Sequence, residues 1–294
     1  MNVMILAAGE GTRLRPYTEQ TPKPAIPFLS VPLGAYALSL LDSIEIHRLV
    51  VNTHHLPPQI DKLFRGFTPQ WKDLVFSHES PQLLGSGGGI HNAQKFLKGQ
   101  GDFFVLNGDE IILPHQPGLL EEMLSFHKWH KGLATLLTME HPEVGCKFGG
   151  AWLNQGTQIQ CFSKTPPGSQ APRGLHFTGV LLLSERIFSY FKNQIEVENI
   201  LYETLTNAMA AGEEVHSFEC KAEWFETGNP TDFMSATESC LNAILQISKS
   251  RPYWQEYLLQ TIRLYSQNQF FLEKDWNRLS ELQSAVQKIR KGQL

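Results

Sequence analysis

A glycine-rich loop near the N-terminus carries the first residue types suited to phosphate chemistry. It follows an apolar run that begins at Val3, and its sequence is Leu6-Ala7-Ala8-Gly9-Glu10-Gly11-Thr12-Arg13-Leu14-Arg15-Pro16. Glycines let a backbone turn sharply and bring N–H groups against a phosphate, and Arg13 adds a guanidinium that can hold phosphate oxygens. The loop has neither Walker nor G-x-G-x-x-G spacing, so an ordinary strand-to-helix turn remains the alternative.

A lysine enclosed by prolines follows this loop, in Thr21-Pro22-Lys23-Pro24. Proline fixes its own backbone and restricts the residue before it, so the Lys23 ammonium is expected to be held in one place. A lone loop lysine is usually solvated. Its position just after a glycine loop instead suggests a fixed cation for a polyphosphate.

The first half of the chain shows the patterns of the helices and strands that must position these groups. Compact apolar runs alternate with helical patterns, the runs at 3–7, 49–51, 74–76, 103–106 and 134–139 and the helices at 33–41, 90–97 and 119–129. Continuous apolar strands that alternate with helices predict an α/β fold with a mostly parallel sheet covered on both faces. Polar and glycine residues at the strand ends place ligand chemistry along one edge of that sheet.

The second half of the chain is mixed. Strands are expected at 150–153, 159–162, 177–183 and 215–220, and a helix at 198–211. From Thr231 the pattern is helical, with apolar faces at Trp254, Tyr257, Leu258, Ile262 and Tyr265, then at Trp276, Leu279, Leu282, Val286 and Ile289. We expect these faces to pack on the main domain; a homo-oligomer contact is the sharper alternative, and a membrane-surface helix the remote one.

Composition limits the class of protein. The chain has 294 residues, of which 41% are hydrophobic and 18% charged, so a core can form. A net charge of −4 argues against a non-specific nucleic-acid binder. No apolar run approaches the roughly 20 residues of a membrane span, and no basic region precedes the first apolar residues, so we expect neither membrane insertion nor secretion. Four scattered cysteines favour a cytoplasmic protein with reduced thiols.

The glycine loop and the P-K-P segment together resemble the signature of sugar-1-phosphate nucleotidyltransferases, also called nucleotide-sugar pyrophosphorylases. The resemblance covers roughly residues 1–240 and implies a Rossmann-like sheet with a smaller sugar-binding β subdomain. It divides the chain into a nucleotide-binding part at about 1–140, a sugar-binding part at about 141–230 and a helical C-terminal extension at 241–294. It also implies a Mg²⁺-dependent enzyme that joins a nucleoside triphosphate to a sugar 1-phosphate and releases pyrophosphate.

The nucleotide-binding residues implied by the resemblance come from two glycine segments and the P-K-P lysine. They are Leu6, Ala7, Ala8, Gly9, Gly11, Thr12, Arg13, Lys23, Gly87 and Gly88. The second segment, Leu84 to Ile90, has a triple glycine that is similar to N-acetylmuramate- and mannose-1-phosphate nucleotidyltransferases. UTP is therefore the first expectation for the donor and GTP the second.

Two acidic residues match the family's metal-binding positions. Asn107-Gly108-Asp109 resembles its G-D motif, in which the aspartate binds Mg²⁺. Trp224-Phe225-Glu226-Thr227-Gly228 resembles W-x-D-x-G, with Glu226 in place of the second metal-binding aspartate. Glutamate can ligate Mg²⁺ but is one methylene longer than aspartate, so the resemblance leaves open a shifted site or a reduced activity.

The sugar-binding residues implied by the resemblance are Asn107, Gly149, Lys164 and Thr178. Lys164 occupies the position of the lysine that pairs with the sugar phosphate. Ser163 replaces the preceding glutamate of the family and Phe177 replaces an asparagine, so the identity of the sugar is left open. His176, which precedes Phe177, is either a structural histidine or a residue of the sugar pocket, and no His/Cys zinc spacing is present.

The resemblance implies an in-line attack of the sugar phosphate on the α-phosphorus without a protein nucleophile. Arg13, Lys23, Asp109 and Lys164 are then the catalytic candidates, and they act by positioning and charge neutralisation. Two alternatives remain: a transferase for a phospho-amino-alcohol such as phosphocholine, and a non-catalytic nucleotide-sugar-binding regulatory relative.

Overall fold

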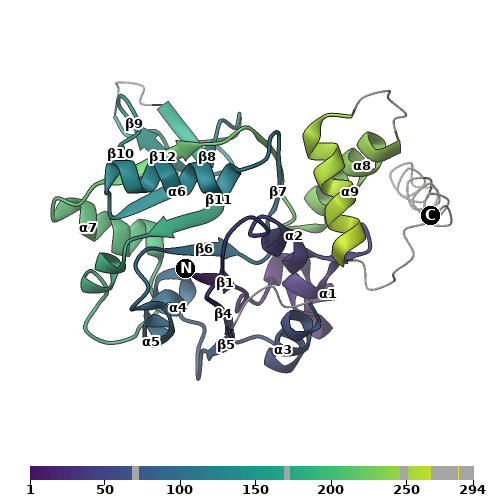
Figure 1. Cartoon of the computed structure of the whole chain (residues 1–294), viewed down its shortest axis with the longest axis horizontal. Helices are drawn as coiled ribbons and strands as arrows, with labels where there is room; N and C mark the ends of the chain where they lie inside the picture. The colour runs from purple at the N-terminus through teal and green to yellow at the C-terminus, as the bar shows by residue number, and fades with distance from the viewer. Residues whose placement is uncertain (68–72, 169–172, 246–250, 266–283, 285–294) are drawn as a thin grey trace.

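Four parallel strands form one half of a nine-stranded sheet (Figure 1). The computed structural model describes residues 1–67, 73–168, 173–245, 251–265 and 284. The strands are β1 (Asn2–Leu6), β4 (Arg48–Thr53), β5 (Asp73–His78) and β6 (Phe103–Asn107). They lie in the order β6-β1-β4-β5, so their carboxyl ends meet at one edge, as the sequence predicts.

Both faces of this half are buried, which explains its continuous apolar strands. Val3 and Ile5 of β1 face one core cluster, whereas Met4 faces the other. The helices are α2 (Leu33–Ser39), α3 (Pro57–Gly66), α4 (Gly85–Asn92) and α5 (Gln94–Leu97). Helices α2 and α3 contribute to the first cluster, and α4 and α5 to the second. The α/β fold class is therefore confirmed.

The other half of the sheet is mixed and is organised around one long strand. Its strands are β8 (Ala134–Met139), β9 (Gly150–Leu153), β10 (Ile159–Ser163), β11 (Arg173–Leu183) and β12 (Val215–Glu219). Strand β11 pairs antiparallel with β6, β8 and β9, and β9 continues to β10. The strands expected in a smaller β subdomain thus continue the same hydrogen-bonded sheet.

Helical segments flank this mixed half of the sheet. They are α6 (Leu119–His130), η3 (Glu185–Ser189), the π-helix η4 (Ile200–Leu205) and α7 (Thr206–Ala210). The single helix expected at 198–211 is therefore a π-helical turn followed by a short α-helix.

A two-stranded ribbon, absent from the sequence-based prediction, brings the two acidic motifs together. Strand β7 (Ile111–Pro114) pairs antiparallel with β13 (Ala222–Phe225), with Ile111 opposite Phe225. Asp109 lies just before β7 and Glu226 just after β13. The ribbon therefore holds two distant parts of the sequence at the same end of the sheet.

Two helices after β13 pack on the parallel half. They are α8 (Pro230–Leu245) and α9 (Tyr253–Tyr265), beside α2 in Figure 1. Leu258, Leu259 and Ile262 are buried, and the Tyr257 hydroxyl donates to Ser39 Oγ at 2.9 Å. Packing of the first predicted apolar face on the main domain is confirmed. The second face, from Trp276 to Ile289, lies outside the described residues, and the homo-oligomer contact stays a prediction. None of the described helices has the length and apolar character to cross a membrane.

Candidate functional site

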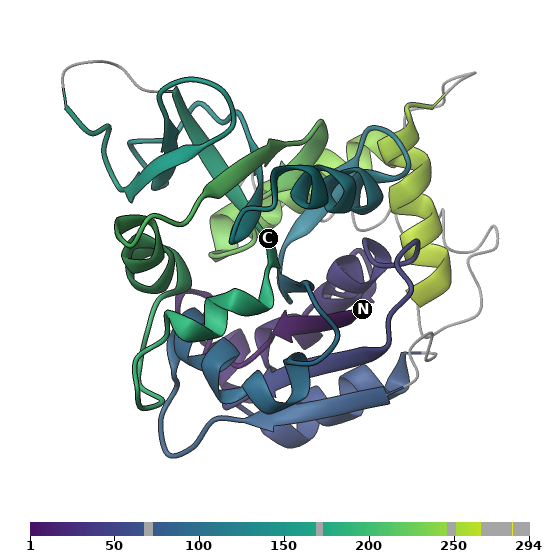
Figure 2. The ribbon, with the colours of Figure 1, turned by 60° about the vertical axis from the view of Figure 1, so that its left-hand side comes forward.

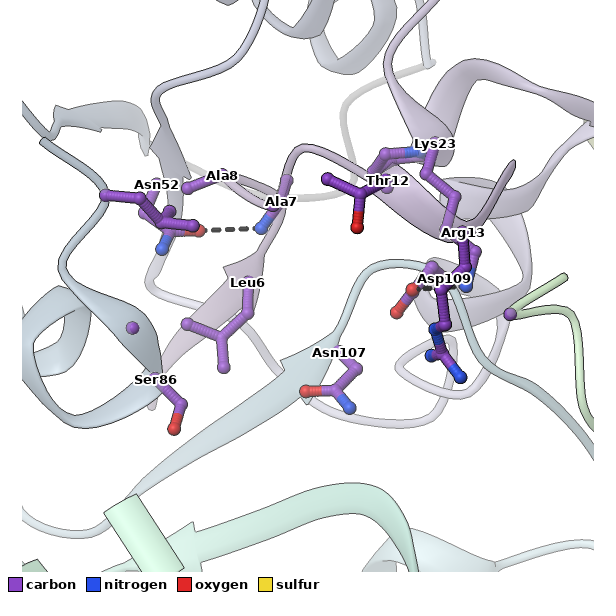
Figure 3. A pocket seen from close by; sticks show the side chains of 16 residues that line it. Leu6, Ala7, Ala8, Thr12, Arg13, Lys23, Asn52, Ser86, Asn107 and Asp109 are labelled. Atoms are coloured by element: carbon purple, nitrogen blue, oxygen red, sulfur yellow. Dashed lines mark hydrogen bonds and ion pairs between the residues drawn. The ribbon is translucent and has the colours of Figure 1, made fainter. Parts of the chain in front are cut away.

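A cavity of about 360 Å³ lies where the first glycine loop meets the carboxyl ends of the parallel strands. Figure 3 shows Arg13, Lys23 and Asp109 close together on one side, with Asn52 and Ser86 on the other. The lining residues are Leu6, Ala7, Ala8, Gly9, Gly11, Thr12, Arg13, Lys23, Pro24, Asn52, Leu83, Gly85, Ser86, Asn107, Asp109 and Gly228. Eight of the ten residues predicted to bind the nucleotide are thus brought together here.

The first glycine loop contains a position that only glycine suits. Gly11 has φ of 60°, in the left-handed region, and a Cβ there would lie 2.8 Å from Cγ2 of Thr18. The Thr18 hydroxyl donates to the Gly11 carbonyl oxygen at 2.9 Å, which fixes the turn. The chain therefore continues directly into η1 (Thr12–Leu14), which carries Arg13.

A buried carboxylate braces this loop from behind. The Ala7 N–H donates to Asn52 Oδ1 at 2.6 Å, and Asn52 Nδ2 donates to Glu79 Oε1 at 2.7 Å. The other Glu79 oxygen accepts the Leu84 N–H at 2.7 Å. Glu79 is 1% exposed, and burial raises its pKa while these hydrogen bonds oppose the shift. Asn52 and Glu79 thus couple the first glycine loop to the start of α4.

Lys23 and Asp109 form an ion pair on the cavity wall. The Lys23 ammonium lies 2.6 Å from Asp109 Oδ2, and the lysine side chain is 12% exposed. Pro22 and Pro24 set Lys23 in the short helix η2 (Lys23–Ala25), which bears out the expectation of a fixed cation. The Thr227 hydroxyl donates to the Asp109 carbonyl oxygen at 2.9 Å and joins the loop after β13 to this pair.

Arg13 and Glu226 approach each other across Gly228. The Gly228 N–H donates to Glu226 Oε1 at 2.6 Å. A Cβ at Gly228 would lie 2.7 Å from Nη2 of Arg13 and would also collide with the Glu226 carboxylate. The absence of a side chain at Gly228 therefore leaves room for both charged groups.

Asp109 lines the cavity and Glu226 lies beside the lining residue Gly228, and their carboxylate oxygens are of the type that suits a hard divalent cation. Asp109 Oδ1 and Glu226 Oε2 accept no hydrogen bond from any described residue. Mg²⁺ is typically held by one or two carboxylates together with substrate phosphates and water, so two carboxylates suffice. The described residues contain no cluster of three or more His, Cys, Asp or Glu that would hold a metal without substrate.

Glu110 is a residue of this region that the sequence reasoning missed. Its carboxyl accepts hydrogen bonds from Trp224 Nε1 at 2.9 Å and from Asn107 Nδ2 at 3.3 Å. Burial, followed by the charge of Asp109, raises the pKa of Glu110 to about 8. Its position beside Asp109 was the only available signal. The carboxyl links Asn107, on the cavity wall, to β13.

Of the predicted sugar-binding residues, Asn107 ends β6 and lines the cavity, whereas the other three lie in or beside the mixed half of the sheet. Lys164 is exposed just beyond β10, with no ion pair to any described residue. Gly149 precedes β9, whose first residue, Gly150, lies opposite Ser163. The structure does not place Thr178 in the site. Its side chain is fully buried and its hydroxyl donates to the Leu137 carbonyl oxygen at 3.0 Å, because this part of β11 lies between β6 and β8.

His176 lies in a cluster of rings and not on the wall of the cavity. Its ring centroid lies 4.3 Å from that of Trp224, 4.9 Å from Phe148 and 5.6 Å from His141. Both ring nitrogens are buried, and neither has a hydrogen-bond partner among the residues that the structure describes. Burial, with a smaller effect of His141, lowers the pKa of His176 to about 4. The structural reading of this histidine therefore fits better than a sugar-pocket role.

Comparisons with known proteins show the family to which this chain belongs. The profile of the nucleotidyl transferase family matches residues 2–243. The chain belongs to this family. It is 28% identical over 254 residues to a UTP–glucose-1-phosphate uridylyltransferase of Synechocystis sp., covering 82% of this chain and 64% of that protein. It is 26% identical over 257 residues to a mannose-1-phosphate guanylyltransferase of Arabidopsis thaliana, covering 85% of this chain and 68% of that protein.

The nucleotidyltransferase fold is also found among solved structures. A UDP-glucose pyrophosphorylase from Acinetobacter baumanii superposes with a TM-score of 0.71 at 19% identity, covering 90% of this chain and 99% of that one. At this identity the likeness shows the fold alone. The predicted family is confirmed by the profile match over residues 2–243. This chain aligns with only about two thirds of the length of the two curated relatives named above.

The second glycine segment lies partly on the cavity wall and partly inside a helix. Residues 85–92 form helix α4, and Gly85 and Ser86 line the cavity. Gly87 and Gly88 are buried inside that helix, where their N–H groups donate to the Glu198 carbonyl oxygen at 2.8 and 3.3 Å. These contacts give both glycines a packing role, and their predicted contact with the nucleotide stays a prediction.

Proposed function

We propose that this protein transfers a nucleotidyl group from a nucleoside triphosphate to a sugar 1-phosphate, with Mg²⁺, and releases pyrophosphate. The observation that carries the proposal is the convergence of the first glycine loop, Arg13, Lys23 and Asp109 on one cavity at the carboxyl edge of the sheet. That edge is where parallel α/β sheets bind their ligands. UTP is the favoured donor and GTP the second. The names of the relatives support both bases.

The donor is held by backbone N–H groups of the loop and by two cations. Arg13 is exposed at the end of the loop, where its guanidinium can hold phosphate oxygens in a fork. Lys23 supplies a point charge that offsets the charge of the triphosphate as pyrophosphate leaves. Both act by electrostatic stabilisation in a preorganised site, and no protein nucleophile is needed.

Asp109 and Glu226 are the residues that would hold Mg²⁺. When bound there, the ion would neutralise negative charge that develops as pyrophosphate leaves. Lys23 already contacts one oxygen of Asp109, so it orients that carboxylate as well as neutralising charge. Glu226 is oriented by the Gly228 N–H.

The acceptor lies towards Gly149 and Lys164. Lys164 holds the attacking phosphate and offsets its repulsion from the triphosphate, and Asn107 reaches a sugar hydroxyl from the cavity wall. Asn107 is itself positioned by its hydrogen bond to Glu110. Ser163 and Phe177 stand at positions where the family has glutamate and asparagine, so the sugar is best found by experiment.

The test is pyrophosphate release by the purified protein with Mg²⁺, each of the four ribonucleoside triphosphates or dTTP, and a panel of acceptors that contains sugar 1-phosphates and phosphocholine. Release with one pair supports the proposal and identifies base and sugar together. Release with phosphocholine alone would replace the acceptor class. Nucleotide binding without release from any acceptor would contradict the transferase and favour a regulatory relative. Omission of Mg²⁺ should abolish release.

A further inference from the structure

The π-helical turn η4 lies between the donor side and the acceptor side of the proposed site. It contacts α4, which borders the cavity, and β10, which precedes Lys164. In Figure 2 the green segment that contains it lies at the left, between the lower blue helices and the upper teal strands. π-helical turns are rare in proteins overall, but those that occur are often found at functional sites. The side chains of η4 are therefore candidates for substrate contact.

The donor-side anchoring of η4 is extensive. The Glu198 carbonyl oxygen accepts the Gly87 and Gly88 N–H groups, and the Glu198 N–H donates to the Leu84 carbonyl oxygen at 2.9 Å. The Ile200 N–H donates to Oγ of Ser86, a cavity-lining residue, at 3.0 Å. The start of η4 is thus fixed directly to the helix that borders the donor.

Asn199 then caps the turn and sets the position of Tyr202. Its Oδ1 accepts the N–H groups of Leu201 at 2.9 Å and of Tyr202 at 3.0 Å. A side-chain cap of this kind satisfies the free N–H groups of the first turn. The backbone that carries Tyr202 is therefore defined by hydrogen bonds that run back to the donor side.

On the acceptor side, the Tyr202 hydroxyl lies directly over Gly149. A Cβ at Gly149 would collide with this hydroxyl and would lie 3.5 Å from the Ser163 carbonyl oxygen. Tyr202 is 43% exposed, and its hydroxyl has no hydrogen-bond partner among the described residues. The Tyr202 hydroxyl is thus free to bind a ligand. It lies beside Gly149 and near Ser163, the residue that precedes Lys164.

We propose that Tyr202 is an acceptor-binding residue whose hydroxyl donates a hydrogen bond to an oxygen of the sugar 1-phosphate between Gly149 and Lys164. The inference rests on the proposed function and adds a residue to its acceptor side. The hydrogen bond from η4 to Ser86 fixes the position of this phenol relative to the donor cavity. Tyr202 therefore distinguishes acceptors by the position of an oxygen atom and does not contribute to selection of the base of the nucleoside triphosphate.

The first test is Tyr202→Phe, which keeps the ring and removes the hydroxyl. We expect KM for the sugar 1-phosphate to rise about tenfold, as for loss of a hydrogen bond to a charged oxygen, with KM for the nucleoside triphosphate unchanged. The matched control is Tyr253→Phe, at a tyrosine of α9 that is 38% exposed. An acceptor KM equal to that of the unmodified enzyme would overturn the assignment.

The second test uses the contact with Gly149. Gly149→Ala should raise the acceptor KM, because its methyl group displaces the Tyr202 hydroxyl. The same substitution should change the acceptor KM little in a Tyr202→Phe background, where the colliding oxygen is absent. Additive effects of the two substitutions would show that the residues act separately, against the proposal.

Failure of the proposed function would be distinguishable from failure of this inference. Calorimetric titration with glucose 1-phosphate and mannose 1-phosphate measures acceptor binding without turnover. Weaker binding to Tyr202→Phe than to the unmodified protein supports the assignment even if no pyrophosphate is released. Equal affinities, or no binding to either protein, would overturn it.

Discussion

At the scale of single residues, the Lys23–Asp109 pair concentrates opposite charges where the triphosphate is proposed to lie. Lys23→Ala removes one cation and leaves Asp109 unpaired beside Glu110. We expect pyrophosphate release to fall by about 10²- to 10³-fold, the usual loss for one electrostatic group of such a site. Lys62→Ala, at an exposed lysine of α3, is the matched control. A Lys23 variant with undiminished kcat would remove this residue from the mechanism.

Glu226 offers a sharper test of the metal proposal. Glu226→Asp restores the family's usual residue but shortens the side chain and withdraws it from the Gly228 N–H. If the glutamate is a direct ligand, the Mg²⁺ concentration for half-maximal activity should shift by several-fold, and Glu226→Gln should raise it further. Unchanged Mg²⁺ dependence in both variants would exclude ligation by this side chain.

His176 makes a pH-dependent contribution to stability. Its pKa is lowered to about 4, so the unfolded chain, with a pKa near 6.5, binds the proton more tightly. The free energy of unfolding should therefore fall as pH decreases from about 6.5 to 4, by up to about 3 kcal/mol from this group. Urea unfolding of His176→Phe should show a shallower fall over that window. An identical pH profile would contradict a neutral, buried His176.

At the scale of elements, α4 shows why Gly88 occurs inside a helix. A Cβ at Gly88 would collide with the Glu196 carbonyl oxygen, so Gly88→Ala should lower the free energy of unfolding by about 1–3 kcal/mol. Gly66 lies in α3 with open space at its Cβ position. Gly66→Ala should be neutral or stabilising by up to about 1 kcal/mol. Equal denaturation midpoints for the two variants would contradict the packing role of Gly88.

The sequence predicted those elements whose signal is local. The strands at 3–7, 49–51 and 103–106 are buried on both faces, so each appears as an uninterrupted apolar run. The ribbon of β7 and β13 was missed because its pairing joins segments far apart in the chain. The burial of Thr178 was not foreseen, because a motif match does not show which side of β11 a side chain occupies. Gly87 and Gly88 match the nucleotide-binding motif, but the carbonyl groups of Glu196 and Glu198 take the space beside them.

At the scale of the whole molecule, α9 closes the apolar face of the parallel half. Leu258 is fully buried there, whereas Leu264 on the same helix is 57% exposed. Leu258→Ala should lower the free energy of unfolding by about 2–5 kcal/mol, and Leu264→Ala by less than about 0.5 kcal/mol. Similar urea midpoints for the two variants would show that α9 does not belong to the cooperative core.

The ribbon of β7 and β13 also bears on the order in which the protein becomes competent during synthesis. A ribosome delivers the glycine loop, Lys23 and Asp109 long before Glu226, and N-terminal regions can begin to fold as they emerge. Until β13 pairs with β7, Thr227 has no contact with Asp109 and Arg13 has no neighbour at Gly228. A nascent chain that stops before residue 222 would thus contain most of the proposed nucleotide-binding residues. It would have Asp109 but not Glu226, the second proposed metal ligand. Catalysis would then begin only after the last strand of the ribbon has docked.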